Sequence, residues 1–217
     1  ACHLPEFTML EWYRQGANWR DVLADTIGAF QAVALSCLGS LECRFRGRRI
    51  DLAAPWPELT VEEAFRRFAG IDVDETLANG CFEQVLVDAV EPCLGLERPT
   101  ILSEYPLGGT GLSKPLVGRH DRAERWELYV AGLELANACS ELTDHAEQVR
   151  RFQRTERLRR EEGRDIFPLD QDFLKALEEG MPPCAGVAVG VDRLLMVLAD
   201  ATTIDAVVPF GAEVALG

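Results

Sequence analysis

The chain lacks several features that would assign it to other classes of protein. None of its apolar runs approaches the roughly 20 residues that cross a bilayer, so we expect no contact with a membrane. Its seven cysteines are odd in number, scattered and free of C-x-x-C pairs, which argues against a zinc site or a disulfide framework. Reduced thiols are typical of cytoplasmic proteins, and we expect that location.

Basic residues and phosphate-binding signatures are also scarce. The 217 residues hold 22 lysines and arginines against 36 acids, a net charge of -14, which disfavours nonspecific nucleic-acid binding but permits a local basic patch. There is no GK[ST] sequence for a P-loop, and GVAVG at 186–190 does not fit the GxGxxG pattern. The composition, 47% hydrophobic and 27% charged, indicates one sizeable domain, with or without a small insertion.

A predicted β-hairpin at 125–144, RWELYVAGLELANACSELTD, is the most informative stretch. Apolar Trp126, Leu128 and Val130 alternate with polar positions, as in a half-buried strand. The dipeptide at 131–132, Ala-Gly, suits a two-residue turn. With that turn, strict alternation predicts these facing pairs: Val130 with Leu133, Tyr129 with Glu134, Leu128 with Leu135, and Glu127 with Ala136.

The polar face of this hairpin brings two acids together. Glu127 and Glu134 become diagonal neighbours there, and close carboxylates repel each other unless a cation or a proton lies between them. Mg²⁺ takes oxygen ligands and leaves positions for phosphate oxygens. A solvated face with incidental acids explains the pattern equally well, so the hairpin alone leaves both interpretations open.

The two ends of the sequence hold further candidate elements. Residues 5–13 predict a strand, and residues 185–199 predict a small-residue strand that meets a buried helix at Gly190. Arg193 falls in the first turn of that helix, where a guanidinium and free backbone N–H groups can address a phosphate. A purely structural arginine is the alternative. One face of the first strand carries Phe7, Met9, Glu11 and Tyr13.

Three segments, in this order, resemble motifs of the class II lysyl-tRNA synthetases. PEFTMLEWYR at 5–14 resembles the second half of motif 2. ELYVAGLELANACSELTD at 127–144 resembles the substrate and metal segment, and GVAVGVDRLLM at 186–196 resembles motif 3. The ELAN and ELTD sequences resemble most the paralogous branch of this family that lacks an anticodon domain and ligates β-lysine to elongation factor P.

This resemblance implies a fold and an activity. Residues 1–217 would form one α+β domain, a class II aminoacyl-tRNA synthetase catalytic domain with an antiparallel β-sheet flanked by helices. The activity would be activation of a lysine-like amino acid, in particular (R)-β-lysine, with ATP and Mg²⁺, followed by transfer to a lysine of elongation factor P. The resemblance implies a homodimer and makes tRNA an unexpected partner. The alternatives are a lysyl-tRNA synthetase and a degenerate paralogue that binds an amino acid or a partner protein.

The resemblance also implies roles for individual residues. At the ATP site, Phe7 would stack on adenine beside His3. Arg193 would hold the γ-phosphate, and Glu127 and Glu134 would carry Mg²⁺. The implied catalytic residues are Arg193, Glu127 and Glu134. The implied substrate-binding residues are Glu11 for the amino group, Tyr13 and Glu141 for the distal ammonium, Asn137 beside the metal, and Ala136 and Ala188.

Strict alternation in the hairpin conflicts with one of these roles. It puts Asn137 on the face opposite Glu127, so the implied role requires a β-bulge near Ala136. It also points the methyl group of Ala136 at the reaction centre, where it would crowd the amino group of ordinary lysine more than that of β-lysine.

The sequence departs from the family pattern in three places. It begins inside motif 2, without motif 1, the motif 2 arginine and an upstream glutamate for the substrate. We expect these in a longer chain, and the alternative is a truncated paralogue. Residues 137–139, Asn-Ala-Cys, stand where the family has NGF or NGY, so a thiol replaces an aromatic ring. The segment after Ile71 is shorter than the family pattern.

Overall fold

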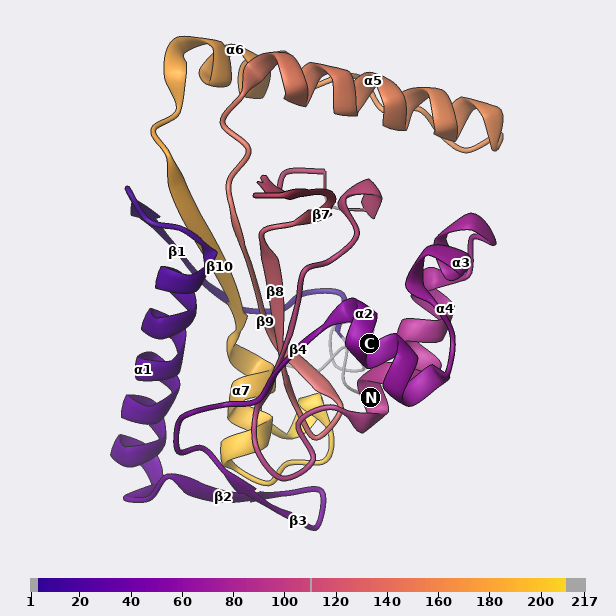
Figure 1. Ribbon diagram of the computed structural model, residues 1–217. Helices are drawn as coiled ribbons and strands as arrows, with labels where there is room; N and C mark the ends of the chain where they lie inside the picture. The colour runs from indigo at the N-terminus through magenta and orange to yellow at the C-terminus, as the bar shows by residue number, and fades with distance from the viewer. Residues whose placement is uncertain (1–3, 110, 210–217) are drawn as a thin grey trace, which may run out of the picture.

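The fold is a six-stranded sheet with helices on both faces (Figure 1). The computed structural model describes residues 4–109 and 111–209. The strand order is β1-β10-β9-β8-β5-β4, and every neighbouring pair is antiparallel except β4 with β5. The predicted α+β class, an antiparallel sheet flanked by helices, is confirmed.

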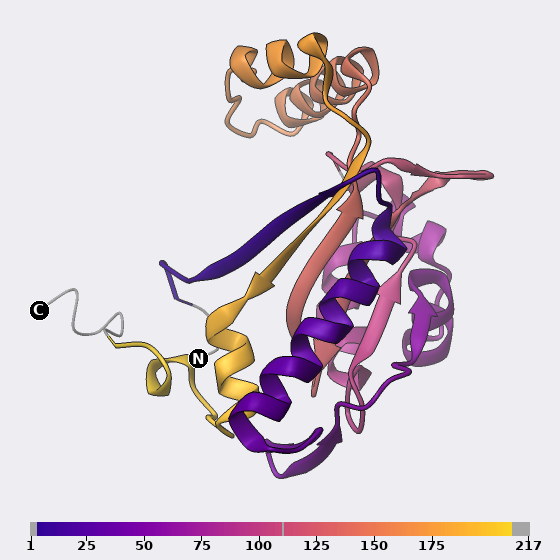
Figure 2. The same ribbon diagram turned by 90° about the vertical axis from the view of Figure 1, so that its left-hand side faces the viewer.

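Two small two-stranded sheets and several helical turns complete the architecture, and α5 and α6 lie together beyond one end of the main sheet (Figures 1 and 2). The strands are β1 Met9–Gln15, β2 Glu42–Phe45, β3 Arg48–Asp51, β4 Glu58–Thr60, β5 Thr100–Ser103, β6 Pro115–Leu116, β7 Arg119–Ala123, β8 Arg125–Val130, β9 Leu133–Ser140 and β10 Cys184–Gly190. The helices are α1 Trp19–Leu38, α2 Val61–Ala64, α3 Val73–Ala78, α4 Phe82–Val85, α5 His145–Glu161, α6 Gln171–Gly180 and α7 Val191–Leu198. The π-helical turns are η1 Phe65–Ala69 and η2 Leu86–Val90, and the 3-10 turns are η3 Glu91–Cys93, η4 Leu107–Gly109 and η5 Ile204–Ala206.

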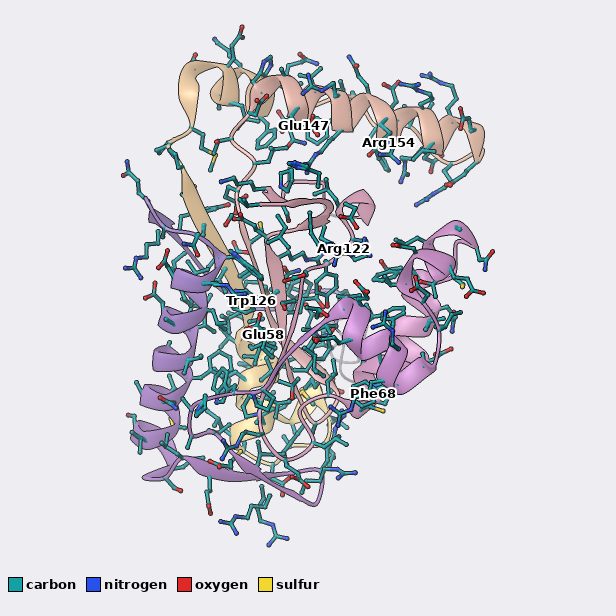
Figure 3. The ribbon with its side chains drawn as sticks, viewed as in Figure 1. Glu58, Phe68, Arg122, Trp126, Glu147 and Arg154 are labelled. Carbon is teal, nitrogen blue, oxygen red and sulfur yellow. The ribbon has the colours of Figure 1, made fainter. Side chains whose placement is uncertain are left out.

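One face of the sheet carries the larger core. Trp126, Leu128 and Val130 of β8 are fully buried there, as their alternation predicts. Burial of a large apolar side chain contributes about 1.5–3 kcal/mol. α1 runs along this face (Figure 2), and the indole Nε1 of Trp126 donates to the carbonyl of Trp19 at 2.7 Å (Figure 3). The start of α1 is therefore tied to the centre of the sheet.

The ends of α1 have clear physical causes. Asn18 and Asp21 form a capping box at its start, and Gly39, with φ of +67°, ends it. α1 spans 20 residues and contains an 18-residue window with a mean hydropathy of 1.4, so by length and composition the helix could cross a membrane, although none of its uninterrupted apolar runs is that long. Val22 and Phe30 are buried against the sheet, so in this fold the apolar side of α1 packs into the core.

The opposite face of the sheet carries a smaller core beneath the helical segment 61–95. Thr60 and Glu63 form the capping box that starts α2, and the rings of Phe65 and Phe82 stack with centroids 5.0 Å apart. Leu102 and Tyr129 of the sheet, and Tyr105 in the loop after β5, contribute buried side chains to this core. The helical segment therefore covers part of the face opposite to α1.

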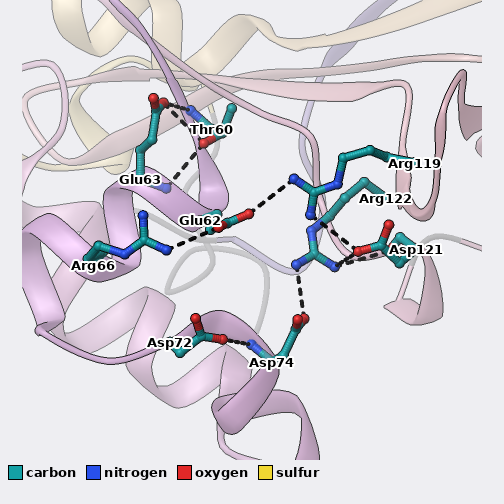
Figure 4. Close-up of polar contacts among 9 residues, drawn as sticks. All are labelled: Thr60, Glu62, Glu63, Arg66, Asp72, Asp74, Arg119, Asp121 and Arg122. Carbon is teal, nitrogen blue, oxygen red and sulfur yellow. Dashed lines mark hydrogen bonds and ion pairs between the residues drawn. The ribbon is translucent and has the colours of Figure 1, made fainter.

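Ion pairs connect this helical segment to β7 (Figure 4). The guanidinium of Arg122, only 3% exposed, lies 2.9 Å from Asp74 of α3 and 2.7 Å from Asp121. Arg119 contacts Glu62 of α2 at 3.2 Å. An exposed pair contributes at most about 1 kcal/mol, whereas a buried guanidinium requires partners, so Arg122 is the main electrostatic link.

The β8–β9 hairpin follows the predicted register only beside its turn. Ala131 and Gly132 form that turn with φ of +48° and +71°, and the two predicted pairs next to it are present. Beyond them Leu135 adds an extra residue to β9 and packs in the core. The other two predicted pairs are wrong, because the bulge pairs Leu128 with Ala136 and Glu127 with Asn137.

A short segment, residues 91–95, is fixed against the tip of this hairpin. The N–H of Ala131 donates to the carbonyl of Gly95 at 2.8 Å, and that of Gly132 donates to Leu94 at 2.9 Å. Gly95 has φ of +69°, and a Cβ there would lie 2.4 Å from the carbonyl oxygen of Tyr129. Only glycine permits this approach.

We predict that Gly95→Ala destabilises the protein far more than Gly80→Ala. Gly80 has a similar φ of +67° but no atom near its missing Cβ, so its substitution should cost about 1–2 kcal/mol from the backbone conformation alone. Gly95→Ala adds a clash with β8 and should cost roughly 3 kcal/mol or more. Urea unfolding of both variants measures the difference, and equal costs would contradict this packing.

Candidate functional site

The bulge aligns side chains in two rows across β1, β10, β9 and β8 on the face opposite to α1, which we call the site face. Residues that face each other across antiparallel strands have Cβ atoms about 4.5–5.5 Å apart. The inner row consists of Glu11, Ala188, Asn137 and Glu127. The distal row consists of Tyr13, Gly186, Cys139 and Arg125.

Glu127 is the most enclosed carboxylate of the site, at 6% exposure. Arg125 contacts its Oε1 at 2.5 Å, and the hydroxyls of Tyr105 and Tyr129 donate to its Oε2 at 2.5 and 2.6 Å. Burial and the Glu127 charge raise the pKa of both tyrosines, so both hydroxyls remain donors. The side chain of Asn137 lies 3.2 Å from Arg125 and joins this network. These contacts hold the carboxyl group of Glu127 in one orientation.

Glu134 lies nearer the hairpin turn, beside Arg193. As predicted, Arg193 is in the first turn of α7, and its Nη1 donates to the backbone carbonyl of Glu134 at 2.8 Å and approaches the Glu134 Oε2 at 3.5 Å. Burial, and then the charge of Glu127, raise the pKa of Glu134 to about 7, although Arg193 opposes the shift. Burial and the charge of Glu127 together thus disfavour the charged form of Glu134 more than Arg193 stabilises it.

The donor chemistry of Glu127 and Glu134 fits Mg²⁺. A divalent cation between them would relieve the repulsion that raises the pKa of Glu134. Among the described residues, no three His, Cys, Asp or Glu side chains are placed to hold a metal by themselves. Mg²⁺ commonly takes one or two carboxylates together with water and substrate phosphates, so two carboxylates suffice for an ion that also binds a nucleotide.

The distal row ends in a cluster of polar side chains over Gly186. A Cβ on Gly186 would lie 2.6 Å from Tyr13 Cε1 and 2.8 Å from Glu141 Oε1, so both side chains occupy the space that this glycine leaves. The thiol of Cys139 donates to Glu141 Oε1 at 3.6 Å, and burial raises its pKa to about 12, so it stays neutral. Burial also raises the pKa of Glu141. An enclosed carboxylate beside a neutral thiol favours an ammonium partner.

A cavity of about 280 Å³ lies between the sheet, α7 and the start of β1. The N–H of Thr8 donates to Asp192 Oδ2 at 2.8 Å, which fixes the start of β1 to α7. Phe7 is 62% exposed, so a flat ligand could stack on it. His3 lies outside the described residues. The cavity brings together six of the predicted site residues: Phe7, Glu134, Ala136, Asn137, Ala188 and Arg193.

The structure corrects the expected orientation of Ala136. This residue lines the cavity, but the bulge pairs it with Leu128 and Val189, and it packs with them in the larger core. The alanine that stands in the inner row is Ala188, between Glu11 and Asn137. The extra residue in β9 reverses the face of Ala136, which strict alternation cannot anticipate.

The sequence reasoning also missed residues that build the site. Arg125 and Tyr105 both contact Glu127. Arg125 had a signal, because it is two residues before Glu127 and so shares its face. Tyr105 lies in a loop at another strand end, and nothing local connects it with the hairpin. Gly186 had the signal of a glycine inside a strand, which often marks a close approach.

Comparisons with known proteins place the chain in a family. The family model described as tRNA synthetases class II (D, K and N) matches residues 1–214. The lysine–tRNA ligase of Moorella thermoacetica is 37% identical over 230 residues, which cover 96% of this chain and 46% of that protein. Those of Pelotomaculum thermopropionicum and Thermosynechococcus vestitus are 34% and 35% identical, and each alignment covers 96% of this chain and 45% of the relative.

The chain thus spans a little less than half the length of these curated relatives. Both the family match and the similarity to the relatives extend over nearly the whole chain, including every strand that forms the site face. The chain belongs to the class II tRNA synthetase family that acts on aspartate, lysine and asparagine.

Proposed function

We propose that this chain is the catalytic part of an ATP-dependent ligase that activates a lysine-like amino acid as an adenylate. The observation that carries the proposal is the polarity of the site face. Its distal end offers Glu141 and Tyr13 above Gly186, and its other end offers Glu127, Glu134 and Arg193. The first end suits an ammonium group and the second suits nucleotide phosphates with a cation.

The residues between these ends suit the reacting groups. Glu11 would bind the amino group of the substrate, and Asn137 and Arg125 stand near the position of its carboxylate. The carboxylate attacks the α-phosphate of ATP, which yields the adenylate and pyrophosphate. Glu127 and Glu134 would hold Mg²⁺, which would supply neutralisation of phosphate charge. Catalysis by this chain is positioning and charge compensation rather than side-chain acid–base chemistry.

Arg193 would change partners when ATP binds. Its guanidinium now contacts Glu134, and a planar fork can grip two phosphate oxygens instead. Phe7 would stack on the adenine ring at the exposed rim of the cavity. Both residues are placed where the same nucleotide could reach them.

We further propose that (R)-β-lysine is the substrate and that the acceptor is a lysine of elongation factor P, with the protein acting as a dimer. Ala188 is the observation that supports (R)-β-lysine as the substrate, because this residue stands between Glu11 and Asn137 in the inner row. There it crowds an amino group on the α-carbon more than one on the β-carbon. The named relatives are lysine–tRNA ligases, so transfer to tRNA is the competing function.

The acceptor is tested with the full-length gene product and radiolabelled (R)-β-lysine. We expect ATP-dependent label on elongation factor P and none on tRNA. Label on tRNA alone would identify a lysyl-tRNA synthetase, and label on neither, with no pyrophosphate exchange, would identify a degenerate binding protein. Both outcomes contradict the proposed acceptor.

Ala188→Gly should relax the choice between substrates. Removal of the methyl group should improve activation of α-lysine relative to (R)-β-lysine by roughly 10-fold to 200-fold, the usual effect of one methyl-sized misfit. ATP–pyrophosphate exchange with each substrate measures the ratio. Ala136→Gly is the matched control: its methyl group lies in the core, so it should lower stability without altering preference. If Ala136→Gly changed the substrate preference more than Ala188→Gly does, the methyl group of Ala136 would face the reaction centre, as strict alternation predicts.

Glu134 gives a pH-dependent prediction for the metal-free protein. Its pKa rises from 4.5 to about 7 on folding, so the native state binds a proton that the unfolded chain releases, and stability falls as pH rises through this window. Glu134→Gln removes this titration. In EDTA, the variant should therefore melt at a higher temperature than the parent at pH 8, and the difference should shrink towards pH 5. A difference that is constant with pH would refute the assignment.

A further inference from the structure

The carboxylate of Glu91 approaches the cation site from outside the sheet. Glu91 is half-buried at the start of η3, and its Oε1 lies 3.2 Å from the hydroxyl of Tyr129. The same hydroxyl lies 2.6 Å from Glu127 Oε2. A phenol has one proton, and the shorter contact to Glu127 takes it. Glu91 is thus separated from a proposed metal ligand by a single buried hydroxyl.

The backbone around Glu91 is built for this approach. The segment 91–95 is bonded to the turn that joins β8 to β9. A Cβ on Gly132 would lie 3.3 Å from the carbonyl oxygen of Glu91, so the turn and η3 are in contact. The strands on either side of this turn carry Glu127 and Glu134. The position of Glu91 is therefore fixed relative to both.

The carboxylate of Glu91 is the third acidic group near the cation site, after those of Glu127 and Glu134. Burial, with a contribution from Glu127, raises the pKa of Glu91, while Arg193 opposes the shift. The charge of Glu91 in turn contributes to the raised pKa of Glu134. Because the hydroxyl of Tyr129 contacts both Glu91 and Glu127, the carboxylate of Glu91 is close enough to add its charge to the cation site. Mg²⁺ retains several of its water molecules when it binds to proteins, and those waters are hydrogen-bond donors.

We propose that Glu91 is an outer-sphere carboxylate of the cation site and accepts hydrogen bonds from water on the metal. This inference rests on the proposed function, because it requires that Glu127 and Glu134 bind the cation. Direct ligation does not fit, since no three acids among the described residues are placed to hold a metal together. Glu91 is in this sense a positioning residue: it orients the hydrated ion and adds charge, and it touches neither substrate nor nucleotide.

The test measures Mn²⁺ binding to the full-length gene product with a non-hydrolysable ATP analogue, from the electron paramagnetic resonance of free Mn²⁺. Glu91→Gln removes the charge but keeps a hydrogen-bonding group for Tyr129. It should weaken Mn²⁺ binding roughly tenfold, the usual effect of losing an outer-shell partner. Glu91→Asp keeps the charge and should recover part of the affinity.

Glu97→Gln is the matched control, because Glu97 is an exposed acid six residues along the same connection. It should bind Mn²⁺ like the parent. If Glu91→Gln also binds like the parent, or if Glu91→Asp is as weak as Glu91→Gln, Glu91 has no outer-sphere role. The melting temperature without metal should not fall in Glu91→Gln, and a large fall would show a structural role instead. If the parent binds neither Mn²⁺ nor the nucleotide, the proposed function itself fails.

Discussion

One extra residue in β9 decides which side chains meet on the site face. Without the bulge at Leu135, either Glu134 or Asn137 would point into the larger core, because one step in register turns every later side chain to the other face. With it, both join Glu127 on the same side, and two neighbouring apolar residues, Leu135 and Ala136, are buried together. The core tolerates the bulge because it accommodates both of these side chains.

The resulting site has carboxylates at two separate ends of one face of the sheet. At the distal end, Glu141 accepts no charged donor among the described residues. At the other end, the acids Glu91, Glu127 and Glu134 outnumber the arginines beside them. Burial makes the charged forms of Glu134 and Glu141 unfavourable in the free protein, although Arg193 and the thiol of Cys139 partly compensate. Under the proposed function, an ammonium group and a cation with phosphates would relieve this cost. Binding energy of this kind can align a carboxylate with an α-phosphate without any proton transfer by the protein.

The sequence was sufficient for most elements and for the general location of the site. Period-two alternation identified β8, and Asn18 and Thr60 are residue types that commonly start helices, as both do here within capping boxes. The bulge was foreseen as a requirement for Asn137 but could not be derived, because a local pattern does not reveal an extra residue. Contacts between segments that are distant in the sequence could not be predicted either, because they too leave no local pattern. Tyr105 and Glu91 reach Glu127 and Tyr129 only through the packing of loops against the hairpin.

The central claim is that this site face selects an amino acid with a distal ammonium group. The most direct measurement is Mg²⁺-dependent ATP–pyrophosphate exchange by the full-length gene product with three amino acids: (R)-β-lysine, α-lysine and norleucine, which has the same chain length as lysine without the ammonium. The account predicts exchange with the lysines, strongest with (R)-β-lysine, and almost none with norleucine. Exchange with norleucine as fast as with the lysines, or no exchange with any of the three, would contradict it.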